Sequence, residues 1–131
     1  MRGWLKGLPR IFERQIMLKK DFDLVQNDDY AAADSRALVF TGAGQNWPDL
    51  TAATFALYAR TSGETDTLFS TTGTRSIVSG VQSISVPLTA AQTAKLPAGA
   101  NAAQYDLVAV LSTRRITLAQ GFFSVSKVSA S

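Results

Sequence analysis

The chain has 131 residues, of which 46% are hydrophobic and 18% are charged, a balance that predicts one ordinary domain with a packed core. It contains no cysteine and no histidine, which excludes disulfides, zinc sites built from thiolate and imidazole, and Ser-His-Asp triads within the chain. Catalysis is left with carboxylate pairs or a Ser-Lys arrangement, so we expect no enzyme activity, no catalytic residue, no metal site and no cofactor.

Hydropathy along the chain predicts neither a membrane-spanning segment nor secretion. No apolar stretch approaches the roughly 20 residues that cross a bilayer. The N-terminus is basic but lacks a continuous apolar segment followed by a small-residue cleavage site, so a secretory signal is not expected. We therefore expect a protein that is made and assembled in a cytoplasm, without a membrane partner.

Residues 1–20 form a predicted basic arm, and residues 21–131 form the rest of the chain. The arm carries six basic side chains and one acidic one, whereas the rest carries seven basic and nine acidic ones. Basic residues recur every four positions and apolar residues fall on another side, a pattern typical of a basic amphipathic helix. Two glycines and a proline weaken that helix, so we expect an arm that becomes ordered on contact. The side chains expected to bind a partner are Arg2, Trp4, Lys6, Leu8, Arg10, Ile11, Phe12 and Arg14.

Three interpretations of this arm stay open. Its apolar side chains could dock on the same domain or on a symmetry-related copy, because amphipathic segments usually bury their apolar face. They could instead insert into a neighbouring protein subunit. The basic side chains could also contact nucleic acid or an anionic membrane, in which case binding would depend strongly on salt.

The segment after the arm predicts two strands separated by a turn. Phe22 and Leu24 alternate with acidic residues, which indicates a strand with one buried face. Residues 27–29 mark a turn, and residues 35–40 predict the second strand. Several turn-forming residues then predict a loop over residues 41–49.

The next segment predicts a core strand followed by shorter ones. In residues 54–60, Phe55, Leu57 and Ala59 fall on one face and polar residues on the other, which is the clearest strand pattern of the chain. Residues 62–66 predict a hairpin turn. Further short strands are expected over residues 67–71, 76–79 and 81–88.

A short helix is predicted over about residues 89–96. Thr89 can cap its N-terminus, and Gln92, three residues later, can complete a capping box. Pro97 ends the helix, and Leu96 is expected to pack it against the domain.

The last third of the chain returns to a strand pattern. A continuous apolar run within residues 105–111 predicts a central strand covered on both faces. Two basic residues at 114–115 end or bend it, and two last strands are expected over residues 116–119 and 122–128. Seven or more short strands without alternating helices predict an all-β fold, an antiparallel β-sandwich.

Some polar and aromatic residues permit a functional and a structural interpretation. Trp47 could stack on a sugar, but packing at the end of the sandwich or at a subunit contact is preferred. Asp28, Asp29 and Asp34 could hold a hard cation, but their spacing fits no EF-hand loop and a turn is preferred. Asp106 is interpreted as a hydrogen-bonding or solvent-facing strand residue and not as a catalytic acid.

Four short motifs follow one another along the chain. They are Asp49-Leu50-Thr51 before a core strand, Pro87-Leu88-Thr89-Ala90-Ala91-Gln92-Thr93, Tyr105-Asp106-Leu107, and Gly121-Phe122-Phe123-Ser124-Val125. In this order the chain resembles the immunoglobulin-like N-terminal domain of the baseplate upper protein family and related phage structural proteins, roughly from Asp21 to Val128. Such relatives usually continue into a stalk or a receptor-binding portion, whereas this chain ends at Ser131.

The resemblance implies an immunoglobulin-like sandwich and a non-enzymatic structural protein of the phage virion, assembled in the host cytoplasm. A basic arm on such a domain fits a tail or baseplate adaptor, a fibre base or a capsid decoration subunit. The implied partners are capsid, portal, tail or fibre subunits, in a homo-oligomeric or symmetric assembly, with contact between the arm and nucleic acid as a less favoured alternative. An alternative from another class is a carbohydrate-binding sandwich that uses Trp47, Tyr58 or Tyr105 as stacking platforms.

Overall fold

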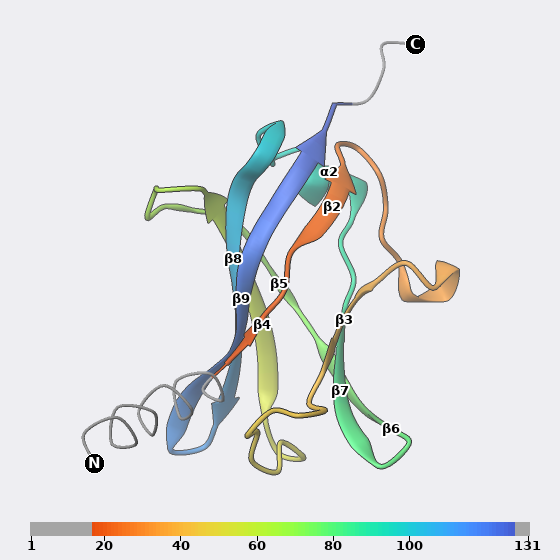
Figure 1. Cartoon of the computed structure of the whole chain (residues 1–131), viewed down its shortest axis with the longest axis vertical. Coiled ribbons are helices and arrows are strands. Elements are labelled where there is room, and N and C mark those ends of the chain that lie inside the picture. The colour runs from red at the N-terminus through yellow and green to blue at the C-terminus, as the bar shows by residue number, and fades with distance from the viewer. Residues whose placement is uncertain (1–16, 128–131) are drawn as a thin grey trace, which may run out of the picture.

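The computed structural model describes residues 17–127, which form a sandwich of two β-sheets (Figure 1). The arm residues expected to bind a partner, from Arg2 to Arg14, lie outside the described residues. The strands are β1 Leu18–Lys19, β2 Phe22–Val25, β3 Leu38–Thr41, β4 Thr54–Thr61, β5 Thr67–Thr72, β6 Thr74–Val78, β7 Val81–Val86, β8 Gly99–Leu111 and β9 Arg114–Ser126. A 3-10 turn, η1 Ala32–Asp34, and a short helix, α2 Ala90–Thr93, complete the elements.

The larger sheet has the strand order β1-β9-β8-β4-β5, with β2 also pairing with β9, and the smaller sheet has the order β3-β7-β6. Immunoglobulin domains place their strands G, F, C and C′ in one sheet and B, E and D in the other. Strands β9, β8, β4 and β5 occupy the first set of positions, and β3, β7 and β6 occupy the second. The predicted all-β, immunoglobulin-like sandwich is therefore confirmed.

The pairing of β1 and β2 differs from the expected antiparallel arrangement. Both strands run parallel to β9, with Leu18 beside Ala119 and Phe22 beside Phe123. All other strand pairs are antiparallel. Because β1 is part of the sheet, the sandwich includes two residues that the sequence pattern assigned to the arm.

Strand β9 is one continuous strand of 13 residues, so the prediction of two separate last strands was wrong. Gly121 does not interrupt it, because this residue stays paired with Tyr105 of β8. The glycine allows another backbone to come close: a Cβ atom added at Gly121 would lie 1.8 Å from the carbonyl oxygen of Lys20. A glycine inside a strand often marks such a close approach.

The core lies between the sheets and contains a cluster of aromatic rings. Phe22 and Phe40 meet edge to face with centroids 5.4 Å apart, and Tyr105 stacks on Phe123 at 4.9 Å. Aromatic pairs of this kind stabilise a fold beyond the area that they bury. The alternation predicted for β4 is confirmed, since its inward residues are buried and belong to the same core.

The predicted short helix is present at one end of the sandwich (Figure 1). The side-chain oxygen of Thr89 accepts a hydrogen bond from the backbone N–H of Gln92, and the side chain of Gln92 accepts one from the backbone N–H of Thr89. This is the expected capping box. Leu96 follows in a turn and is buried in the core. Among residues 17–127, no helix is long and apolar enough to span a membrane.

Strands β5 and β6 are one stretch of chain that passes from the larger sheet to the smaller one (Figure 1). A single residue, Gly73, lies between them. A Cβ atom added there would lie 3.0 Å from Ile84 and 3.1 Å from Val86, so the crossing packs directly on the core.

Candidate interaction surface

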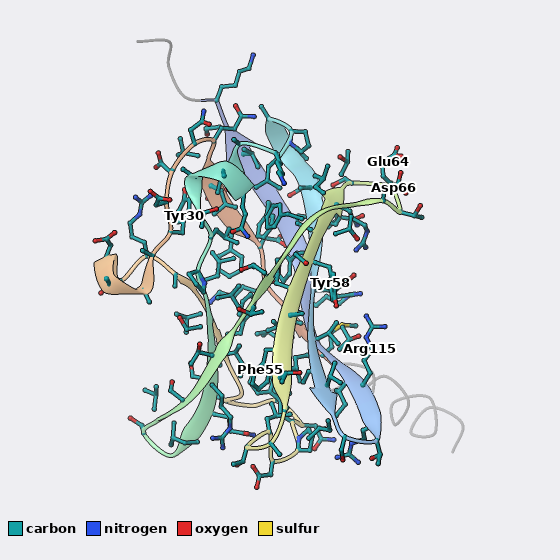
Figure 2. The ribbon with its side chains drawn as sticks, turned by 180° about the vertical axis from the view of Figure 1, so that it is seen from behind. Tyr30, Phe55, Tyr58, Glu64, Asp66 and Arg115 are labelled. Carbon is teal, nitrogen blue, oxygen red and sulfur yellow. The ribbon has the colours of Figure 1, made fainter. Side chains whose placement is uncertain are left out.

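The outer face of the larger sheet carries the most polar side chains that converge on one place. Tyr58 of β4 lies opposite Asp106 of β8 and opposite Ser70 of β5, on the face that points away from the core. Figure 2 shows Tyr58 near the middle of this sheet, with Arg115 on one side of it along the strands and the β4–β5 turn, marked by Glu64 and Asp66, on the other side. We refer to the outer side of strands β9, β8, β4 and β5 as the outer face.

An ion pair is located near the centre of the outer face. The Nη1 atom of Arg60 lies 2.7 Å from Oδ2 of Asp106, and both side chains are about a quarter exposed. The amide of Gln120 donates to the other oxygen of Asp106 at 2.8 Å. Both carboxylate oxygens are therefore occupied, and the interpretation of Asp106 as a hydrogen-bonding strand residue is confirmed.

Two shallow hollows, of about 170 and 310 Å³, flank this ion pair, and Arg60 and Asp106 line both. Lys19 lines the smaller hollow. Tyr58 and Arg115 line the larger one, together with Thr65 of the β4–β5 turn and Thr67 at the start of β5. Across the two hollows, three cationic side chains therefore line the same surface as the carboxylate of Asp106, which already has Arg60 and Gln120 as partners. The hollows are suited to a carboxylate from a binding partner.

The turn between β6 and β7 is a second exposed surface. Ile77 is 53% exposed and Val78 is 58% exposed, immediately before a turn formed by Ser79 and Gly80. Both turn residues have a positive φ, as tight hairpin turns require. The predicted strand over residues 76–79 therefore ends one residue earlier. Two adjacent exposed aliphatic side chains at a hairpin tip are a typical protein contact.

Trp47 is packed into its own loop. It is half-buried against the core, and a Cβ atom added at Gly42 would lie 2.7 Å from its ring. Its indole nitrogen is buried and has no hydrogen-bond partner among residues 17–127. Tyr105, another proposed stacking platform, is 1% exposed. Of the three aromatic side chains considered for a sugar site, only Tyr58 is exposed.

The loop around Trp47 is held by a residue that the sequence pattern did not single out. The side chain of Gln82 accepts a hydrogen bond from the backbone N–H of Leu50 and donates one to the carbonyl oxygen of Pro48, each at 2.8 Å. In the same loop, hydrogen bonds from the hydroxyl and backbone N–H of Thr51 hold the pKa of Asp49 below its ordinary value. These contacts fix the start of β4.

The carboxylates considered for a cation have local partners instead. Asp28 pairs with Arg36 at 3.1 Å, and this hydrogen bond raises the pKa of the guanidinium. Asp29 accepts a hydrogen bond from the backbone N–H of Ala90 at the start of α2. Among residues 17–127, no three acidic side chains are grouped as metal ligands. The turn after β2 lies at Gln26 and Asn27, and Asp28 and Asp29 follow it directly.

Three side chains of the outer face were not predicted from the sequence: Arg60, Arg115 and Gln120. The alternation of β4 placed Arg60 on the outward side, but nothing local linked it to Asp106, 46 residues later. Arg115 was interpreted only as the end of a strand. The strand register brings these residues together.

No protein-family model matches the chain, and a search of curated proteins finds no match.

Proposed function

We propose that the chain is a non-enzymatic structural protein of a phage virion. It would attach to other virion subunits through its N-terminal arm and the exposed edges of its sandwich, as a tail or baseplate adaptor, a fibre base or a capsid decoration subunit. Its partners would be capsid, portal, tail or fibre subunits arranged with the symmetry of the particle.

The observation that carries this proposal is the order of the four motifs together with their places in the sandwich. The first motif directly precedes β4, and the second forms the connection from β7 through α2. The third and fourth lie in the two neighbouring strands β8 and β9. The resemblance to the baseplate upper protein family implies an immunoglobulin-like sandwich that carries these motifs in this order.

The open strand edges support an attachment role. Strand β5 is the last strand on one side of the larger sheet, and β3 and β6 are the outer strands of the smaller sheet. Unpaired edges can accept a strand from another chain. The side chain of Lys20 already occupies part of the β3 edge, because its Nζ donates to the carbonyl oxygen of Val39 at 2.9 Å.

The experiment is a mass-spectrometric inventory of particles purified from the phage or prophage that encodes this chain. The chain is expected in the particles in a fixed ratio to a symmetric component. Particles that lack it would overturn the proposal.

Two matched variants then assign the attachment surface. Deletion of residues 1–16 removes the arm but keeps β1, whereas deletion of residues 1–20 would also remove strand pairs with β9. The pair Ile77→Ser and Val78→Ser alters the β6–β7 turn alone. Loss of incorporation by one folded variant and not the other identifies the surface. Full incorporation of both leaves the sheet edges as the attachment site.

A carbohydrate-binding function is supported only by Tyr58, which is 37% exposed beside the larger hollow. If the chain binds sugars, a glycan array gives hits that Tyr58→Ala removes. An array without hits for the intact chain argues against this alternative.

A further inference from the structure

We propose that the outer face binds the outer face of a second copy, so that Arg115 of each copy receives the acidic β4–β5 turn of the other. This goes beyond the proposed attachment, because it concerns a sheet face and not the arm or the edges. The occupant is a copy of this chain, and the contact is a closed dimer.

The strand register places the backbone of Arg115 and the start of the β4–β5 turn at similar distances from Tyr58. Arg115 pairs with Val110, which pairs with Thr54, four residues before Tyr58 on β4. The β4–β5 turn begins at Ser62, four residues after Tyr58. At roughly 3.3 Å per residue, the backbone of Arg115 and the start of the turn each lie about 13 Å from the row of Tyr58 along the strand.

The charges at the two ends of the outer face are opposite in sign. Glu64 and Asp66 are exposed on the β4–β5 turn, and Arg115 is exposed at the other end (Figure 2). Within residues 17–127, none of these three side chains forms an ion pair. Thr65, between the two acidic residues, lines the same hollow as Arg115, so both ends border one continuous surface.

A two-fold axis makes this arrangement self-complementary. An axis that lies between two facing sheets and passes close to Tyr58 and Asp106 exchanges the two ends of the face. Arg115 of one copy then meets Glu64 and Asp66 of the other, and the same contact forms a second time on the far side of the axis. Such an isologous contact closes on itself and leaves the sheet edges free.

The charges also indicate which of three possible partners fits the outer face: the arm of the same chain, an acidic segment of another protein, or a second copy. Residues 1–16 of the same chain carry four basic side chains and one acidic one, so the cations of the hollows repel this segment. An acidic segment of a different protein would use the same cations, but it would leave the acidic turn without a partner. A second copy provides an acidic partner for Arg115 and a basic partner for the acidic β4–β5 turn in the same contact.

The size of the face predicts a weak dimer. Four strands at about 4.8 Å spacing and eight residues at about 3.3 Å give a flat area of roughly 500 Å² per copy. This is at the low end of specific interfaces, so we expect association in the micromolar range that weakens as salt increases.

The first test is sedimentation equilibrium of the full chain over a concentration series at low salt. The wild-type chain is expected to dimerise, and Arg115→Glu should weaken the dimer by about tenfold or more, because like charges then face each other. Combining Arg115→Glu with Glu64→Arg and Asp66→Arg should restore it. Arg114→Glu is the matched control: this neighbour carries the same charge but does not line the hollow, and its variant should dimerise like the wild type.

The second test locates the axis. The chain has no cysteine, so Tyr58→Cys introduces a single reactive thiol near the proposed axis. A short bis-maleimide should join two copies through this thiol, whereas Ser76→Cys on the other sheet should remain unlinked. A melting curve for each variant establishes that it is folded.

Three results would overturn the proposal: a monomeric wild-type chain at every concentration, a dimer that Arg115→Glu leaves intact, or equal cross-linking at both cysteines. A monomer whose incorporation into particles depends on Arg115 would instead identify an acidic partner protein. Incorporation into particles is measured separately from dimerisation. The dimer proposal can therefore be overturned while the proposed virion role holds, and the virion role can be overturned while the dimer proposal holds.

Discussion

The phenolic oxygen of Tyr105 donates a hydrogen bond of 2.5 Å to the carbonyl oxygen of Lys20. This bond joins β8 to the junction between β1 and β2, across the intervening strand β9. The hydrogen bond crosses β9 at Gly121, which has no side chain in the way. In the same junction, the side chain of Asp21 accepts a hydrogen bond from the backbone N–H of Phe122 in β9. The start of the sandwich is therefore attached to two successive strands of the sheet.

Replacing Gly121 by alanine should destabilise the fold strongly. The new Cβ would lie 1.8 Å from the carbonyl oxygen and 2.7 Å from the carbonyl carbon of Lys20, and backbone atoms cannot yield as a flexible side chain can. We expect the free energy of unfolding in urea to fall by about 3 kcal/mol, the upper end of the range for overpacking. Gly44→Ala is the control, because it meets no atom within 4 Å and costs only about 1 kcal/mol for its positive φ. Equal losses at both sites would contradict this account.

Tyr105→Phe should remove a pH-dependent part of the stability. Burial, followed by the charges of Asp21 and Asp106, raises the pKa of Tyr105 above its ordinary value near 10. The folded state therefore holds this proton more tightly than the unfolded state. Its contribution is complete below about pH 10 and is lost as the pH rises from there towards the folded pKa, by up to about 1.4 kcal/mol per pH unit.

The measurement is the free energy of unfolding from pH 8 to pH 11. At pH 8, Tyr105→Phe should cost about 1 kcal/mol for the lost hydrogen bond. Above pH 10 the difference between the variant and the wild type should shrink. Tyr58→Phe, a change at an exposed tyrosine, should keep the alkaline loss of the wild type. A constant difference across the range would mean that Tyr105 is not the group responsible.

Gln82→Ala should loosen the loop before β4. It removes the acceptor for the backbone N–H of Leu50, a fully buried residue, and the donor to Pro48. We expect a loss of about 2 kcal/mol in the free energy of unfolding, because a buried donor is left without a partner. Gln104→Ala is the control, with a loss below about 0.5 kcal/mol, since its one backbone contact is exposed. Hydrogen exchange at Leu50 should become faster in the first variant only.

The ion pair between Arg60 and Asp106 should show measurable coupling in a double-mutant cycle with alanine. Because both side chains are about a quarter exposed and Gln120 fixes the carboxylate, we expect a coupling energy of about 1 kcal/mol. The more exposed pair of Arg36 and Asp28 provides a parallel cycle, with a coupling close to zero. Equal coupling in the two cycles would show that Gln120 and partial burial add nothing.

Local patterns predicted the elements whose determinants are neighbours in the chain. The alternation in β4 and the capping box of Thr89 and Gln92 both involve residues within a few positions of each other, and both are present. The sandwich itself followed from the number of short strands.

The missed features depend on contacts between distant residues. The parallel pairing of β1 with β9 joins positions about a hundred residues apart, and no local pattern encodes it. The role of Gly121 was not predicted, because it is set by the carbonyl group of Lys20 lying close above it. The partner of Arg60 likewise depended on a register that only the folded sheets define.

The parallel pairing of β2 with β9 also determines how the domain would respond to a pulling force. The described chain begins beside Ala119 and ends beside Val25, so the two ends leave the sandwich in opposite directions. Tension applied through the two ends would slide β1 and β2 along β9, so that all hydrogen bonds between these strands would carry the force at the same time. Peeling one strand away from the sheet would instead break these bonds one after another. Bonds loaded simultaneously share the force, and the Tyr105 to Lys20 bond would have to break with them. In this geometry the three strands would therefore resist such a force together.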